Sequence, residues 1–184
     1  MIALRYLAVV GLLTAALVYM IADRMALLAS PNVVSLEVIP IDPTDPFRGD
    51  YVILAYKISN IEVDKADGVD DIGFREQVYV ALKQDAQFWV VAGLYRQASA
   101  VPAGQKYIRG LVSNAWEIDD TKRRKIQVTY GIESFFVPQG SGKPLEDAQR
   151  QGVVSADIAL GTDGRAAIKA VRVDGQPVHT ETLF

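Results

Sequence analysis

The sequence predicts a mostly β protein, in which an N-terminal transmembrane helix precedes an antiparallel β sandwich or barrel with one short helix. The first observation behind this prediction is an uncharged apolar run near the N-terminus. The second is an alternation of apolar and polar residues with a period of two over much of the remaining chain. Proline and Asp-Gly turn signals separate the alternating runs, which favours antiparallel connections.

The apolar run covers residues 6–22 and contains no charged side chain. At about 17 residues, it lies at the short end of what crosses a bilayer. The apolar pattern resumes after Arg24 and continues to Ala29, and the Arg24 side chain can extend its charged head to the interface. We therefore expect residues 6–29 to contact the lipid bilayer.

This segment is predicted to be an uncleaved signal anchor rather than a cleaved signal peptide. A signal peptidase site needs a small residue three positions before the cut, where Leu27 or Leu28 would stand here. A buried helix of a soluble protein is the remaining alternative, but few such helices are apolar on every side.

Charges on the two sides of the apolar run predict its orientation. The N-terminal amine and Arg5 lie on the short side, whereas Asp23 and Arg24 offset each other on the far side. The excess of positive charge keeps the N-terminus in the cytoplasm. We therefore divide the chain into a transmembrane anchor, residues 1–30, and one extracytoplasmic β domain, residues 31–184.

Strands follow from the hydrophobic pattern. Residues 34–38, 78–82 and 126–132 alternate between apolar and polar side chains, which predicts half-buried strands. Residues 51–58 and 88–95 are apolar on both faces, so we predict central strands that are covered on both sides. The expected total is about eight or nine strands.

Turn and cap residues mark where these elements end. Two prolines in residues 42–46 fix φ in the approach to the 51–58 strand. The polar segment 64–73 is predicted to be a loop, and Asp163-Gly164 and Asp174-Gly175 are hairpin signals. A single short helix is predicted from Pro144 in its first turn to Gly152 at its C-terminal cap.

The composition limits the chemistry that the chain can perform. It contains 184 residues, no cysteine and one histidine. We therefore expect no disulfide framework, no cysteine nucleophile, no metal centre and no cofactor. The net charge of −3, from 19 basic and 22 acidic residues, argues against a nucleic-acid partner.

The first candidate binding segment is the turn and strand over residues 48–58. An Arg-Gly turn leads to Asp50, which stands where the predicted strand begins. Within that strand Leu54 and Tyr56 share one face, and Tyr51 lies on the other. The interpretation that we favour is a turn followed by a strand, in which Asp50 accepts backbone N–H bonds. The alternative is that Arg48, Asp50 and the tyrosines line a recognition groove.

The second candidate segment lies over residues 130–138. Tyr130, Phe135 and Phe136 stand close together, and Glu133 lies among them. A glutamate flanked by aromatic residues can have a raised pKa and act as an acid. The reading that we favour is a hydrogen-bond or ion-pair role, for example with Arg48.

Residues 49–56, GDYVILAY, fit the pattern Gly-Asp-Tyr-x-x-Leu-x-Tyr and resemble the GDYXXLXY family of bacterial membrane-anchored proteins. The preceding Pro-x-Asp-Pro-x-Asp-Pro approach, residues 130–140 and residues 161–175 are similar to that family too. Gln139 replaces a glutamate that family members often carry, which weakens any acidic role there.

The resemblance implies one N-terminal anchor in the bacterial inner (cytoplasmic) membrane and a domain outside the cytoplasm, without an established activity. Members are often encoded beside multi-pass membrane proteins, which implies such a partner. The motif residues are the candidate binding residues, and we assign none of them a catalytic role: Arg48, Gly49, Asp50, Tyr51, Leu54, Tyr56, Tyr130, Gly131, Glu133, Phe135, Phe136 and Pro138.

The function predicted from these observations is an accessory or binding module that docks on a membrane protein. One alternative is an envelope hydrolase that uses Asp50 and Glu133 as a pair of carboxylates. Another is the binding of a lipid or a small apolar ligand inside a β barrel, which requires a cavity of roughly 300 Å³ or more.

Overall fold

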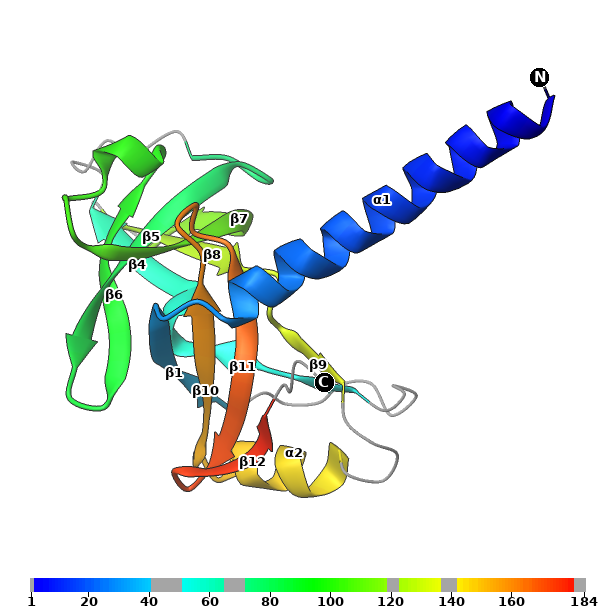
Figure 1. The fold of residues 1–184 in the computed structure, drawn as a ribbon. Coiled ribbons are helices and arrows are strands. Elements are labelled where there is room, and N and C mark those ends of the chain that lie inside the picture. The colour runs from blue at the N-terminus through cyan, green and yellow to red at the C-terminus, as the bar shows by residue number, and fades with distance from the viewer. Residues whose placement is uncertain (1, 41–50, 65–71, 119–122, 137–141, 181–184) are drawn as a thin grey trace.

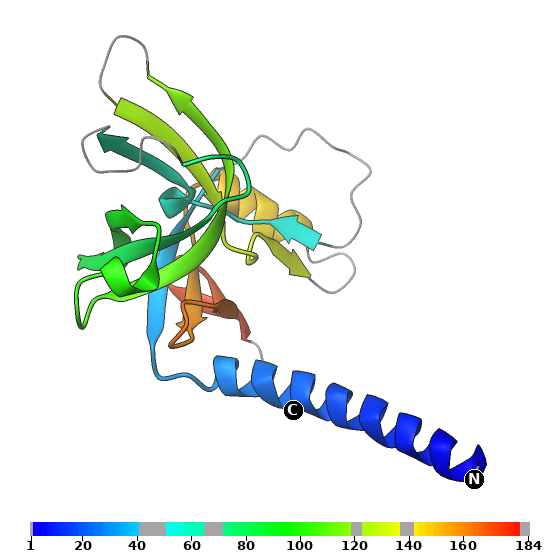
Figure 2. The ribbon, with the colours of Figure 1, turned by 90° about the horizontal axis from the view of Figure 1, so that it is seen from above.

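The computed structural model describes residues 2–40, 51–64, 72–118, 123–136 and 142–180 (Figure 1). The predicted fold class is confirmed: the chain is mostly β with antiparallel strand pairs, a nearly closed barrel-like arrangement and an N-terminal apolar helix. Helix α1 (Ile2–Leu28) projects away from the β body in both views (Figures 1 and 2).

The first five-stranded sheet has the strand order β12-β11-β10-β1-β3. All of its pairs are antiparallel. Its strands are β1 (Val33–Ile39), β3 (Ala55–Tyr56), β10 (Val154–Leu160), β11 (Ala166–Val173) and β12 (Gln176–Thr180).

The second five-stranded sheet has the order β4-β8-β7-β5-β6 and is also antiparallel throughout. Its strands are β4 (Asn60–Asp64), β5 (Gln77–Asp85), β6 (Phe88–Tyr95), β7 (Lys106–Glu117) and β8 (Arg123–Thr129). A separate two-stranded ribbon pairs β2 (Tyr51–Ile53) with β9 (Ser134–Phe136). The short helices are η1 (Lys57–Ser59), η3 (Ala98–Ala100) and α2 (Gly142–Arg150).

The two sheets share one hydrophobic core. The largest fully buried side chains come from both of them and include Leu36 of β1, Leu82 of β5, Ile108 of β7 and Ile158 of β10. Alternation explains this burial, because the inward residues of a half-buried strand recur at every second position. Strand β1 shows the predicted pattern, with Val34, Leu36 and Val38 buried and their neighbours partly exposed.

The prediction of central strands at 51–58 and 88–95 is wrong. The first segment is divided at Leu54 into β2, which pairs with β9, and β3, which pairs with β1. The second segment is β6, which lies at one end of its sheet. A strand with apolar residues on both faces needs other elements packed on those faces. Its composition does not determine whether it pairs with one neighbouring strand or with two.

The predicted short helix is confirmed as α2, which begins two residues before Pro144. Gly152 adopts φ +71°, and its N–H donates to the carbonyl of Gln149 at 2.9 Å, as expected of a C-terminal cap. The described residues contain twelve strands, more than predicted, because β2, β3 and β9 are only two or three residues long.

Candidate functional site

The two motif segments, far apart in the sequence, lie side by side in the structure. Strand β2 pairs with β9 in antiparallel register, so that Val52 faces Phe135. Directly after β2, the N–H of Leu54 donates to the carbonyl of Glu133 at 2.7 Å. The backbone of one motif is therefore hydrogen-bonded to the backbone of the other.

Two tyrosines connect the motif segments reciprocally. The Tyr56 hydroxyl donates to the carbonyl of Ile132 at 2.9 Å, and the Tyr130 hydroxyl donates to the carbonyl of Ile58 at 2.6 Å. Both rings are buried, with exposed fractions of 0% and 7%. Since buried carbonyls without partners are destabilising, each tyrosine satisfies an acceptor that the other segment brings into the core.

These tyrosines are fixed as hydrogen-bond donors. Burial raises the pKa of Tyr56 far above its usual range, and the nearby negative charge of Glu133 raises it further. The same two causes, in the same order, raise the pKa of Tyr130. Both hydroxyls therefore keep their protons at neutral pH.

The Glu133 carboxylate closes the turn between β8 and β9. It accepts the backbone N–H of Tyr130 at 2.5 Å and that of Gly131 at 2.9 Å. Gly131 has φ +78°, a left-handed conformation that favours glycine. These bonds support the hydrogen-bonding role that we favoured for Glu133 rather than that of an acid; the suggested partner Arg48 lies outside the described residues.

The remaining motif residues divide into buried and exposed side chains. Leu54 is fully buried, and Phe135 is buried with its ring edge-to-face on His179 of β12 at 4.9 Å between centroids. Phe136 points outward with 75% of its surface exposed. Four candidates remain untested, because Arg48, Gly49, Asp50 and Pro138 lie outside the described residues. Only the backbone of Tyr51 is described.

The motif therefore acts as a structural clasp in the part of the chain that the structure describes. Its hydroxyls donate to carbonyls, and its one described carboxylate accepts two backbone N–H groups. The hydrolase hypothesis needs the position of Asp50, which is not among the described residues.

A second junction, which sequence reasoning missed, joins α1 to the β body. The Asp23 carboxylate binds both terminal nitrogens of Arg165, at 2.6 and 3.0 Å, and the Nε of Arg165 donates to Asp163 at 2.7 Å. Leu27 is buried, with its Cδ1 close to Gly161 in the β10–β11 turn. The only signal in the sequence was the placement of Asp23 directly after the apolar run.

A polar cluster on β1, β10 and β11 was also missed. The Ser35 hydroxyl donates to Asp157 at 2.5 Å, and the Nε of Arg172 donates to the other oxygen of Asp157 at 2.7 Å. A serine that donates to a carboxylate already paired with arginine lacks the neighbouring base that activates a nucleophile. We therefore interpret this cluster as structural.

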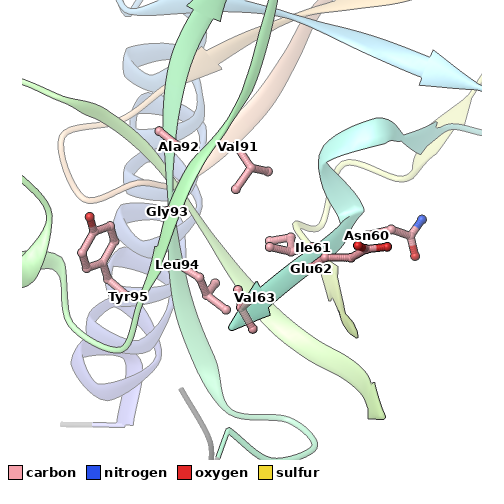
Figure 3. A pocket seen from close by; sticks show the side chains of 9 residues that line it. All are labelled: Asn60, Ile61, Glu62, Val63, Val91, Ala92, Gly93, Leu94 and Tyr95. Carbon is pink, nitrogen blue, oxygen red and sulfur yellow. The ribbon is translucent and has the colours of Figure 1, made fainter. Parts of the chain in front are cut away.

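A groove of about 490 Å³ runs between strands β4 and β6 (Figure 3). Its volume exceeds the roughly 300 Å³ that ligand pockets require, but its walls are two strand edges rather than the inside of a barrel. Successive residues of both strands line it: Asn60, Ile61, Glu62 and Val63 on β4, and Val91, Ala92, Gly93, Leu94 and Tyr95 on β6.

In comparison with known proteins, a protein family described as GDYXXLXY protein matches residues 13–171, which include most of α1, both motif segments and the α1 junction. No curated protein and no solved structure matches the chain.

Proposed function

The chain belongs to the GDYXXLXY family, and we propose that it is a single-pass bacterial inner-membrane protein whose β body docks on a multi-pass partner as an accessory module. Residues 1–30 are the uncleaved anchor in this proposal, with the N-terminus in the cytoplasm and residues 31–184 outside it. The observation that carries the proposal is the direct attachment of α1 to the β body through Asp23, Leu27 and Arg165.

The surface of α1 supports the membrane assignment. The helix is long and apolar enough to cross a bilayer over Arg5–Leu28, and its side chains are exposed from Arg5 to Ala22. At a rise of about 1.5 Å per residue, an uncharged run of about 17 residues extends for about 25 Å. An exposed apolar surface of this size is unfavourable in water, and a bilayer provides the cover.

The junction favours retention of the anchor over its cleavage. Cleavage after Ala29 or Ser30 would remove Asp23, one of the two carboxylates that pair with Arg165. It would also remove Leu27, which packs against the β10–β11 turn. The last turn of α1 is therefore part of the folded body, as expected of an anchor that stays attached.

In this proposal, the same junction holds the β body at the membrane surface. A charged pair such as Asp23 and Arg165 is costly in hydrocarbon, so we place the end of the bilayer close to Ala22, which shortens the expected contact with lipid from residues 6–29 to residues 6–22. No flexible linker separates the helix from the body, because Ser30 donates to the carbonyl of Leu160 at 2.7 Å directly after the helix. A body held at a fixed height and orientation is suited to docking on another protein of the same membrane.

The membrane assignment is tested by removing only the apolar span. Deletion of residues 1–22 leaves Asp23 and Leu27 in place, so the body is expected to fold. The full chain should stay in the membrane after carbonate extraction, whereas the shortened chain should become soluble. Release of the full chain by carbonate, or cleavage near residue 30 in cells, would contradict the anchor.

Docking is tested by recovery of the full chain from native membranes in mild detergent. We expect a defined multi-pass protein to be recovered with the full chain. It should be lost when residues 1–22 are deleted, because the shortened chain is then no longer held in the same membrane as the partner. Recovery of the chain alone, from membranes in which it is correctly inserted, would contradict docking.

A further inference from the structure

Strands β4 and β6 are the two ends of their sheet, and the groove lies between their free edges (Figure 3). Within the described residues, β4 pairs only with β8 and β6 pairs only with β5. The N–H and C=O groups along an unpaired edge are available to hydrogen-bond an added strand. The groove is therefore bounded on both sides by strand edges that can accept a partner.

Strand β6 has the sequence of a strand that is paired on both sides. Its eight residues, FWVVAGLY, contain neither a charge nor a proline, and most of its side chains are only half-buried. Edge strands in soluble proteins normally carry lysine, proline or other features that prevent further pairing. By contrast, β12 at the end of the other sheet contains Pro177.

The inner wall of the groove is apolar. Val91 and Leu94 of β6 point towards Ile61 and Val63 of β4, and Tyr95 points away (Figure 3). Val91 remains partly exposed although it packs against the core. Ile61, Val63 and Leu94 are already buried, so an occupant that places apolar side chains here would cover the part of Val91 that remains exposed.

The groove presents no uncompensated charge. Glu62 is the only charged residue among those that line it, and its carboxylate lies 3.5 Å from Arg123 of the neighbouring strand. A charged occupant would lose hydration without gaining a counter-ion, whereas a neutral segment would not. Charge complementarity therefore selects an uncharged occupant.

We propose that this groove accepts one extended, uncharged segment of the membrane partner, with apolar residues at alternate positions, which pairs with the edges of both β4 and β6. This proposal rests on the docking function proposed above and names its contact surface. Four successive residues of β4 and five of β6 line the groove, so a matching segment of about four residues is about 13 Å long.

Two other occupants fit the groove less well. Strand β6 of a second copy is already paired with its own β5, so it cannot enter between two edges as a single strand. An acyl chain fills apolar space but offers no hydrogen bonds to two strand edges. A single extended peptide satisfies both the backbone groups and the apolar wall.

The absence of cysteine from the sequence allows a direct test with single-cysteine variants of the full chain. A92C places a thiol on β6 and N60C places one on β4, both at exposed positions, while V178C is the matched control on the edge strand β12. Each thiol is labelled with benzophenone maleimide in native membranes and irradiated, and the cross-linked peptides are mapped by mass spectrometry.

We expect A92C and N60C to cross-link the same short, uncharged segment of one membrane protein, with a yield about tenfold above that of V178C. Cross-links to a second copy, to the chain itself or to lipid alone would overturn the proposal. So would partner peptides from unrelated regions at the two positions, or an equal yield from V178C.

A pair of lysine variants tests the groove by another route. V91K places a charge on the apolar wall, whereas V178K places it on the exposed edge strand β12 outside the groove, which serves as the control. Recovery of the partner should fall about tenfold for V91K and little for V178K. Thermal unfolding tests whether both variants are folded. If V91K is not folded, the cross-linking experiment alone tests the proposed groove.

The two proposals fail in distinguishable ways. If the wild-type chain recovers no membrane protein, the docking function itself is wrong. If the wild-type chain and V91K recover the same partner equally well, docking stands and the groove is not its contact surface.

Discussion

The motif clasp and the β4–β6 groove are two places where separate strand segments meet, and they are completed in opposite ways. At the clasp, Tyr56 and Tyr130 each donate to a carbonyl of the other segment, and Leu54 donates to Glu133. At the groove, two edges lie opposite each other without a described strand between them. This difference shows that the motif segments, which have the most recognisable sequence, stabilise the fold. The open surface is instead the groove between β4 and β6.

The largest expected effect is the loss of a whole side chain from the clasp. Tyr56→Ala removes a fully buried ring and its hydrogen bond, and we expect a loss of about 3–5 kcal/mol in the free energy of unfolding. Val91→Ala in the groove wall, where the side chain is half-exposed, should cost about 1 kcal/mol or less. Urea unfolding of the detergent-solubilised chain measures both, and equal losses would remove the contrast between the two regions.

The clasp also predicts instability at alkaline pH. The folded-state pKa values of Tyr56 and Tyr130 lie above the ordinary value, so unfolding favours release of their protons. Their contribution is therefore fully present below about pH 10 and declines by about 1.4 kcal/mol per pH unit for each tyrosine above it. The measurement compares unfolding free energies at about pH 9 and about pH 11 with those of the Y56F/Y130F chain, which should lose this part of the decline. An identical decline in both chains would contradict the assignment.

Removal of one clasp hydroxyl should have a smaller effect. Tyr130→Phe keeps the buried ring but leaves the carbonyl of Ile58 without its donor, at a cost of about 1–3 kcal/mol. Tyr6→Phe in the exposed part of α1 is the matched control and should be neutral. A Tyr130→Phe chain as stable as the wild type would show that this hydrogen bond does not support the clasp.

The smallest effect concerns the turn that Glu133 closes. Gly131 has φ +78°, and a Cβ added there would meet no atom within 4 Å, so Gly131→Ala costs only the left-handed conformation, about 1–2 kcal/mol. Gly73→Ala is the control, since its backbone is not left-handed and an added Cβ likewise meets no atom within 4 Å. Thermal unfolding of the two variants compares these costs, and a larger loss at Gly73 would contradict the argument.

Much of the fold could be predicted from local patterns. The apolar run predicted α1, alternation predicted β1 and β5, and Pro144 with Gly152 bounded α2 to within a few residues. The strand predicted over residues 126–132 is confirmed only as far as Thr129, the end of β8, because the chain turns at Gly131. Within the clasp, the sequence also predicted the shared face of Leu54 and Tyr56, both of which are fully buried. These predictions succeeded because side-chain alternation and caps depend on residues that are close in the chain.

The candidate site was predicted only in part. Its residues were named, but no local pattern indicated that the Tyr56 hydroxyl would donate to the carbonyl of Ile132 or the Tyr130 hydroxyl to that of Ile58. A recognition groove lined by the tyrosines of residues 48–58 was the alternative interpretation, and Tyr56 is instead buried. An aromatic side chain next to a polar turn can line a binding surface or pack in the core. Which of the two it does depends on the segment that packs against it.

The sequence by itself determined the apolar helix, the antiparallel β class and the two Asp-Gly turns at Gly164 and Gly175, because these follow from local periodicity and backbone preferences. Only the tertiary structure decided that β6 lies at an edge, that Asp23 pairs with Arg165, and that the two motifs close on each other. The physical reason is that strand neighbours and ion pairs form between residues far apart in the chain. The residues next to a side chain in the sequence determine which face of its strand is buried, but the order of strands in the sheet determines which residues it contacts.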